Sequence, residues 1–154
     1  MRLPSLILLS MLVVTPVLAQ SSASSDSVAI QEAVMKVLQD YMKPFSSAQA
    51  LDIEAWERSI HFPHYRLSRG KMTIQSAPGE FSLESLRQAL GEDWDHSKWQ
   101  KKHIVHLSES KVHVDTRFAR FRKDGSVIAS YDSLYVLTKE DGRWGVKMRS
   151  TMAH

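Results

Sequence analysis

The chain has 154 residues and a formal net charge of +3, and 43% of its residues are hydrophobic. This length fits one domain, and a mild positive charge with acidic and basic residues interleaved argues against a nucleic-acid-binding surface. The absence of cysteine excludes disulfide bonds, thiolate catalysis and the acylated cysteine of a lipoprotein.

The first 19 residues have the layout of a secretory signal peptide. Arg2 precedes a nearly continuous apolar run from Leu6 to Val14, and the small side chain of Ala19 marks the expected cleavage site. The run is shorter than the ~20 apolar residues that span a bilayer, so we expect cleavage and no membrane contact afterwards. The sequence therefore predicts a periplasmic or secreted protein, with a signal peptide at 1–19, a flexible Ser-rich leader at 20–27 and one domain at 28–153.

Three helices are predicted in the first two thirds of the chain. In the first, apolar residues recur at steps of three and four, which marks one buried stripe on a helix. The first helix is expected to begin at a cap on Asp26 or Ser27 and to end at Pro44. The second is expected to begin at Asp52 and to end by Pro63, and the third to begin at Ser82 and to end at Gly91. Residues 64–68 and 71–75, between the second and third helices, are expected to form two short strands.

The last third of the chain is expected to form four antiparallel strands. They are predicted at about residues 100–107, 112–122, 126–139 and 143–153. Two of the turns are Asp-Gly pairs, at 124–125 and 141–142, which strongly favour a tight hairpin.

Tight hairpins also predict which side chains share a face of the sheet. Two-residue turns place Arg117 opposite Asp132, a favourable cross-strand pair of charges. The expected pairs include His103 with Thr116, Phe118 with Tyr131, Val114 with Tyr135, Leu137 with Val146, Tyr135 with Met148 and Tyr131 with Met152. The face expected beneath the helices then includes His103, Phe118, Arg120, Tyr131, Tyr135, Met148 and Met152. The face expected to meet solvent or a partner subunit includes Ile104, His106, His113, Asp115, Leu134 and Val136.

The order of elements, two helices, a hairpin, a third helix and a meander, resembles the nuclear transport factor 2-like superfamily. Its ketosteroid-isomerase-like and SnoaL-like domains share short segments of similar sequence with this chain. These segments are Ala55-Trp56, residues 61–67, Trp94-Asp95-His96-Ser97, residues 111–114, residues 131–137, and Asp141 to Gly145 with Arg149-Ser150. The resemblance implies an α+β fold in which a curved antiparallel sheet packs as a cone against three N-terminal helices. It also implies a pocket at one end of the cone, often in a dimer.

The resemblance does not extend to the superfamily's best-known catalytic pattern. That pattern places an acidic base near the start of the first strand, whereas this chain has His61, His64 and Arg66 there. The resemblance therefore implies a fold and a pocket, but no particular reaction.

Two histidines are candidates for proton transfer. His103 is expected on the inward face, either as an acid or base or as a core histidine bonded to Thr116. His64 shares a strand face with Arg66, either at the pocket mouth or in solvent.

The predicted ligand-binding residues combine aromatic or thioether walls with two cationic contacts. Arg120 is expected either to hold an anionic ligand group or to extend into solvent, and the tyrosines either donate hydrogen bonds or pack. The set is Arg66, Phe118, Arg120, Tyr131, Tyr135, Met148 and Met152.

We expect no metal and no cofactor. His106 and His113 pair across strands, but a shared ion would lack further ligands. Trp94 to Ser97 are neighbours in a loop and are expected to serve packing and local turn bonds rather than a catalytic triad.

Three functions remain open from the sequence. The first is an exported pocket domain that binds a compact, largely apolar ligand with one polar or anionic group. The second is a proton-transfer enzyme of the isomerase, dehydratase or cyclase type, which would use His103 or His64. The third is an interaction module without a ligand, in which side chains fill the cavity and the outer sheet face mediates dimerisation or partner binding. Ile104, Leu134 and Val136 on that face favour a homodimer.

Overall fold

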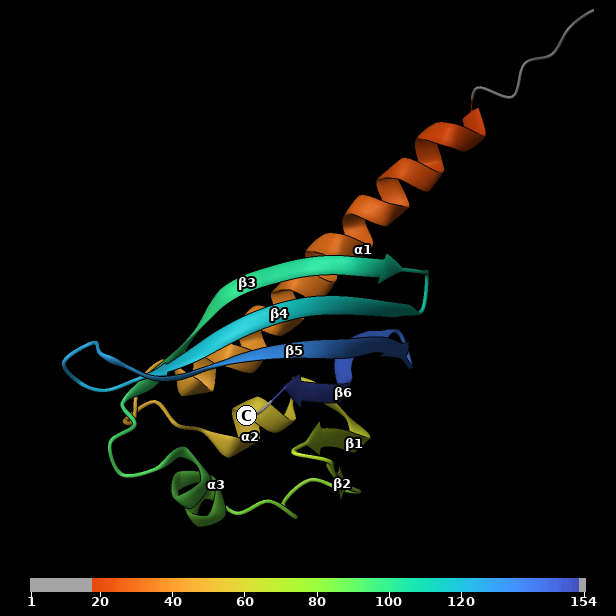
Figure 1. Cartoon of the computed structure of the whole chain (residues 1–154). Coiled ribbons are helices and arrows are strands. Elements are labelled where there is room, and N and C mark those ends of the chain that lie inside the picture. The colour runs from red at the N-terminus through yellow and green to blue at the C-terminus, as the bar shows by residue number, and fades with distance from the viewer. Residues whose placement is uncertain (1–17, 153–154) are drawn as a thin grey trace, which may run out of the picture.

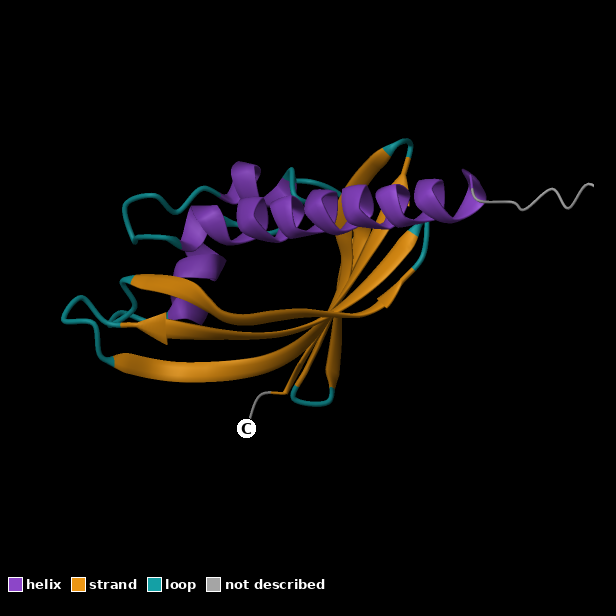
Figure 2. Ribbon diagram, turned by 90° about the horizontal axis from the view of Figure 1, so that it is seen from above, coloured by secondary structure: helices purple, strands orange, loops and turns teal. Residues whose placement is uncertain are grey.

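The computed structural model describes residues 18–152, with side chains described from Ser25 onward. The predicted signal segment lies almost entirely outside these residues. The chain forms two layers, with the helices on one side of a strongly curved sheet (Figures 1 and 2). Within residues 18–152, no helix combines the length and the apolarity needed to cross a bilayer.

The helices follow the predicted order. They are α1 (Leu18–Met42), a 3-10 turn η1 (Lys43–Phe45), α2 (Ile53–Glu57) and α3 (Leu83–Leu90). The caps of the two short helices are confirmed, since the Asp52 carboxylate accepts from Ala55 N at 2.9 Å and the Ser82 hydroxyl from Ser85 N at 3.1 Å. The predicted start of the first helix at Asp26 or Ser27 was wrong, because α1 begins at Leu18 and includes the residues predicted as a flexible leader.

The six strands form one sheet in the order β2-β1-β6-β5-β4-β3. The strands are β1 (Ile60–Ser68), β2 (Lys71–Gln75), β3 (His96–Leu107), β4 (Lys111–Phe121), β5 (Val127–Glu140) and β6 (Arg143–Met152). All neighbours are antiparallel except β1 and β6, which run parallel and so connect the N-terminal hairpin to the C-terminal meander. The predicted α+β cone of three helices and a curved sheet is confirmed.

The predicted register of β4 and β5 is confirmed along most of its length. Val114 pairs with Tyr135, Phe118 with Tyr131 and Arg117 with Asp132. Only the hairpin end differs, because Phe121 pairs with Val127 instead of Ile128. The core below this pair of strands contains aromatic and branched side chains from α1 and the sheet. Its fully buried members include Val34, Leu38, Ile60, Val112, Val114, Tyr135, Leu137 and Val146.

Bulges in β6 and β3 reverse the predicted orientation of the side chains that lie beyond them. In β6, Leu137 pairs with Val146 as expected, but Val136 then pairs with Met148, so Lys147 is an extra residue. In β3, His106 and Leu107 pair as expected, but Val105 is extra and Ile104 pairs with Val114. Because successive side chains alternate between faces, one inserted residue moves every later side chain to the opposite face.

Candidate functional site

A cavity of about 150 Å³ lies inside the cone, between the sheet, the C-terminal end of α1, and α3. An apolar cavity of about this volume is large enough to hold a single benzene ring. Its lining combines aromatic and aliphatic side chains with three arginines. The lining residues are Tyr41, Met42, Phe45, Trp56, Arg66, Phe81, Leu86, Ala89, Leu90, Ser97, Phe118, Arg120, Tyr135 and Arg149.

The three arginines reach the cavity from three strands. Arg66 on β1 is the register partner of Arg149 on β6, so these two lie side by side. Arg120 comes from β4 and donates from Nη1 to the Ala89 carbonyl of α3 at 2.9 Å. An arginine side chain stays protonated in proteins, so the cavity wall has three positive charges.

Among the described residues, no carboxylate balances these charges. The part of the cavity wall formed by described residues contains no aspartate or glutamate, and none of the ion pairs between described residues includes these arginines. Burial, and then repulsion from Arg149, lower the pKa of Arg66. Burial, and less strongly the charge of Arg149, also lower the pKa of Arg120. Burial opposes the charge of Arg149, but the neighbouring Tyr41 and Tyr135 outweigh burial and raise its pKa. The three arginine charges of the cavity wall nevertheless repel one another.

Each arginine lies against an aromatic ring instead. The guanidinium carbon of Arg66 is 4.4 Å from the ring centroid of Phe81. The corresponding distances are 5.3 Å from Arg120 to Tyr131 and 6.0 Å from Arg149 to Phe118. Cation–π contacts orient guanidinium groups without neutralising them.

The polar atoms around the cavity include hydrogen-bond donors that are left unused. Trp56 Nε1, Tyr135 Oη and Arg149 Nε are buried and have no hydrogen-bond partner among the described residues. Burial raises the pKa of Tyr135, so its hydroxyl keeps its proton and can donate. Tyr41 packs edge-on against both neighbouring rings, with centroids 5.4 Å from Tyr135 and 5.9 Å from Trp56. These contacts fix the rings of Tyr135 and Trp56 in the cavity wall.

Four of the predicted ligand-binding residues line this cavity: Arg66, Phe118, Arg120 and Tyr135. Tyr131 stacks on Phe118 from behind, with ring centroids 5.0 Å apart. The placement of Met148 and Met152 on the inward face was wrong, because the bulge at Lys147 turns them outward, and Met152 is 67% exposed. The same bulge turns Arg149 inward, and this is the charged residue that the sequence reasoning missed.

The predicted inward orientation of His103 was also wrong. The bulge at Val105 pairs His103 with Asp115, and its side chain is exposed on the outer face. Ile104, predicted outward, instead packs against the core.

His64 is fully buried but does not line the cavity. Its Nδ1 donates to the Val146 carbonyl at 3.2 Å, and its ring meets Trp56 edge-on with centroids 5.8 Å apart. Burial, and then the charge of Arg149, lower the pKa of His64 to about 4. A base of such low pKa, enclosed in the core, is poorly placed for proton transfer at neutral pH.

His61 joins β1 to β6. Its Nδ1 accepts from Arg143 Nη2 at 2.9 Å, so Nε2 carries the hydrogen and donates to the Arg143 carbonyl at 3.1 Å. Burial, and then the charge of Arg143, lower the pKa of His61. Gly145 leaves space for this ring, because a Cβ there would lie 2.7 Å from His61 Cδ2.

The remaining motifs have local roles. Trp94 Nε1 donates to the Ser97 hydroxyl at 3.0 Å, and the His96 ring stacks on Phe121 at 4.9 Å while its Nδ1 bonds to Asp95. The described residues contain no cluster of three or more potential metal ligands; His106 and His113 lie edge to face, 5.6 Å apart.

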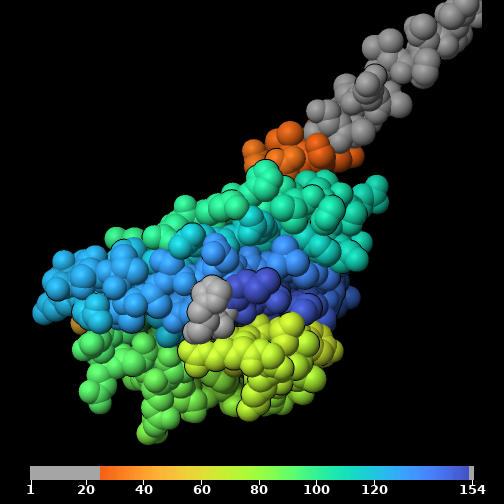
Figure 3. All heavy atoms as spheres, in the orientation of Figure 1, coloured from red at the N-terminus to blue at the C-terminus, as the bar shows by residue number. Residues whose placement is uncertain are grey.

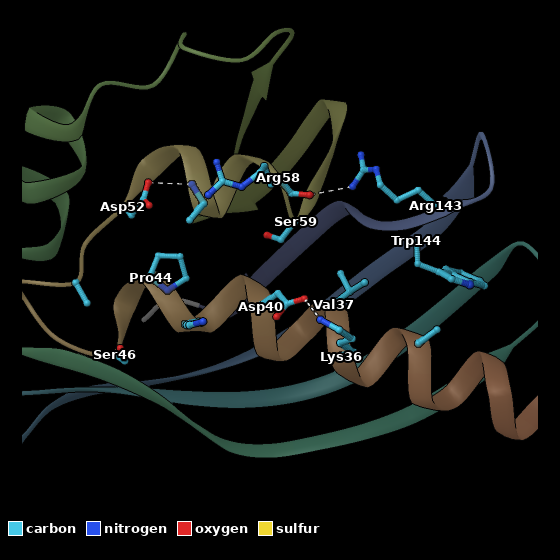
Figure 4. Close-up of a pocket in the computed structure, with 14 residues that line it drawn as sticks. Lys36, Val37, Asp40, Pro44, Ser46, Asp52, Arg58, Ser59, Arg143 and Trp144 are labelled. Carbon is cyan, nitrogen blue, oxygen red and sulfur yellow. Dashed lines mark hydrogen bonds and ion pairs between the residues drawn. The ribbon is translucent and has the colours of Figure 1, made fainter.

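A larger, open groove of about 740 Å³ lies outside the cone, between α1, α2 and the start of β6 (Figure 4). Its charged side chains largely interact with the protein itself. Lys36 bonds to Asp40 at 2.7 Å, Asp52 caps α2, and Arg143 donates to the Arg58 carbonyl at 3.0 Å. The internal cavity, whose arginines have no acidic partner in the part of the chain that the structure describes, is therefore the better candidate for a binding site.

A curved sheet that encloses one cavity with its helices defines a cone-shaped pocket domain. The family described as NTF2-like protein (DUF6841) matches residues 31–154. The chain therefore belongs to this NTF2-like family, and the resemblance seen in the sequence is confirmed. No curated protein matches the chain.

Solved structures with the same fold are distant in sequence. An NTF2-like protein with a cystatin-like fold from Novosphingobium aromaticivorans has 13% identity and a TM-score of 0.67, covering 89% of this chain and 90% of its own. A ketosteroid isomerase-like protein from Erwinia carotovora atroseptica has 17% identity and a TM-score of 0.55, covering 79% of this chain and 93% of its own. The association domain of CaMKII from C. elegans has 12% identity and a TM-score of 0.51, covering 88% of this chain and 97% of its own. At these identities the similarity establishes the fold alone.

Proposed function

We propose that this domain binds a small organic anion inside the cone. The apolar part of the ligand would contact the aromatic wall, and its anionic part would contact Arg66, Arg120 and Arg149. The observation that carries the proposal is the convergence of these three guanidinium groups on a small cavity without any lining carboxylate. A bound anion would relieve their repulsion and accept hydrogen bonds from the unused donors of Trp56 and Tyr135.

A panel of small aromatic acids tests the proposal. Benzoate, phthalate and phenyl phosphate each combine one ring with an anionic group, and binding can be followed by calorimetry and by amide chemical shifts. We expect at least one of them to bind and to shift resonances of the cavity residues. We expect Arg149→Met to lose this binding and Arg117→Met, which removes a guanidinium from the outer face of β4, to retain it. Failure of all three acids to bind, even at millimolar concentration, would refute the proposal.

Export remains part of the proposal and rests on the signal-like layout of residues 1–19. N-terminal sequencing of the protein recovered from the periplasm or the medium tests it. The expected first residue is Gln20, and recovery of the uncleaved chain from the cytoplasm alone would contradict it.

A second role, self-association, is favoured by the outer face of the sheet (Figure 3). Two cross-strand rows of mostly apolar side chains extend over four neighbouring strands. They are Ile74–Tyr65–Met148–Val136 and Met72–Leu67–Ser150–Leu134. Ile74 is 54% and Met72 46% exposed, which leaves large apolar surface open to water.

We propose that a second copy of this chain covers the outer face. Arg117 and Asp132 lie beside the apolar rows as an exposed pair of opposite charges, so the same surface on two copies can be self-complementary. The association domain of CaMKII from C. elegans, a domain named for association, has the same fold. Sedimentation of the wild-type chain should show a dimer that Leu134→Arg dissociates, and a wild-type monomer at high concentration would refute this role.

A further inference from the structure

The three arginines of the cavity differ in how they are held, and this difference bears on the charge of the ligand. Arg66 and Arg149 are neighbours on β1 and β6. Arg120 approaches from β4 and is tied to the Ala89 carbonyl at the end of α3. The cavity therefore has one paired cationic position and one single cationic position on different parts of its wall.

The positive charge of the cavity wall exceeds what a monoanion can neutralise. The described lining has three guanidinium groups and no carboxylate, so a bound monocarboxylate would leave two positive charges unbalanced. The number of hydrogen-bond donors in the cavity wall also favours a ligand with more than one negative charge. Trp56 Nε1, Tyr135 Oη and Arg149 Nε are unused donors in addition to the arginine Nη groups. One carboxylate has only two acceptor oxygens, whereas a phosphate monoester or a dicarboxylate has three or four.

We infer that the ligand of this cavity is a compact dianion, with its two negative charges on either one phosphate monoester or two carboxylates. This inference rests on the proposed function and specifies its ligand class. The small volume requires the two charges to be close together on a body of about one ring. The aromatic wall of Phe45, Phe81 and Phe118 selects against a purely inorganic anion, because such an ion would leave the apolar surface uncovered.

The test compares three ligands that share a benzene ring. At about pH 8, benzoate is a monoanion, phthalate is a dianion with two carboxylates, and phenyl phosphate is a dianion with one phosphate group. We expect at least one dianion to bind about tenfold or more tightly than benzoate at low ionic strength. Arg120→Met should reduce that preference, and Arg117→Met should leave it unchanged. Thermal melting of each variant verifies that it is folded.

The outcomes separate this inference from the proposed function. If either dianion has the expected preference, the inference stands, and the tighter of the two identifies the anionic group. If benzoate binds as tightly as both dianions, the dianion inference is overturned while the anion pocket remains. If none of the three ligands binds, the proposed function fails and the inference fails with it.

Discussion

Acidification should destabilise the fold through His64. This imidazole is fully buried and donates from Nδ1 to the Val146 carbonyl, and burial lowers its pKa from 6.5 to about 4. In the unfolded chain His64 gains its proton near pH 6.5, whereas in the folded chain it stays neutral until about pH 4. The unfolded state therefore binds more protons between these values, and stability falls as the pH is lowered.

The magnitude follows from the interval between the two pKa values. An interval of about 2.5 pH units at about 1.36 kcal/mol per unit gives a loss of about 3 kcal/mol once the pH is below 4. At pH 5 the expected loss is about 2 kcal/mol relative to pH 8. His61, whose pKa burial also lowers, adds to the loss in the same direction.

Urea denaturation between pH 8 and pH 5 measures this loss. His64→Asn keeps an N–H donor near the position of Nδ1 but removes the titrating ring. It should cost about 1–2 kcal/mol at pH 8 through lost packing, and its stability should depend less on pH than that of the wild type. His103→Asn removes an exposed histidine and is the matched control. If the wild type and His64→Asn lose the same free energy between pH 8 and pH 5, the reasoning is wrong.

Three further changes have defined expectations. Arg149→Met should abolish anion binding while the variant still unfolds cooperatively in urea denaturation, because it removes one of the three guanidinium groups of the cavity; retained binding would contradict this. Gly145→Ala should destabilise by about 1–3 kcal/mol, since the new Cβ would meet His61 Cδ2 at 2.7 Å. The double variant with His61→Ala should recover part of that loss, and strict additivity would count against the steric explanation. Leu134→Arg should convert the proposed dimer to a monomer in sedimentation without lowering the melting temperature by more than a few degrees.

The helix caps, the hairpin turns and the register of β4 and β5 could be predicted because their signals are local, whereas the cone was expected from the family resemblance. The caps at Asp52 and Ser82 and the Asp-Gly turns each depend on a few adjacent residues. The register of β4 and β5 followed from the turn between them, and the independent pairing of Arg117 with Asp132 supported it. The start of α1 was missed because a Ser-rich stretch favours caps and loops in isolation.

The cavity was only partly predictable because a bulge has no comparable local signal. Phe118 and Tyr135 were placed correctly, since no register shift separates them from each other in the pairing of β4 with β5. His103 and Met148 lie beyond the extra residues Val105 and Lys147, so their predicted facing was reversed. The same reversal concealed Arg149. An arginine in an alternating strand is expected to face solvent, and its inward orientation follows only from coordinates.

The three arginines inside the cone are proposed to bind an organic anion. The most direct measurement is a titration of phenyl phosphate into the protein, monitored through the Nε–H resonances of its arginine side chains. We expect saturable shifts of the resonances of Arg66, Arg120 and Arg149, with the largest change at Arg149, whose Nε has no partner among the described residues. Shifts confined to exposed arginines such as Arg117, or no saturable shift at all, would contradict the account.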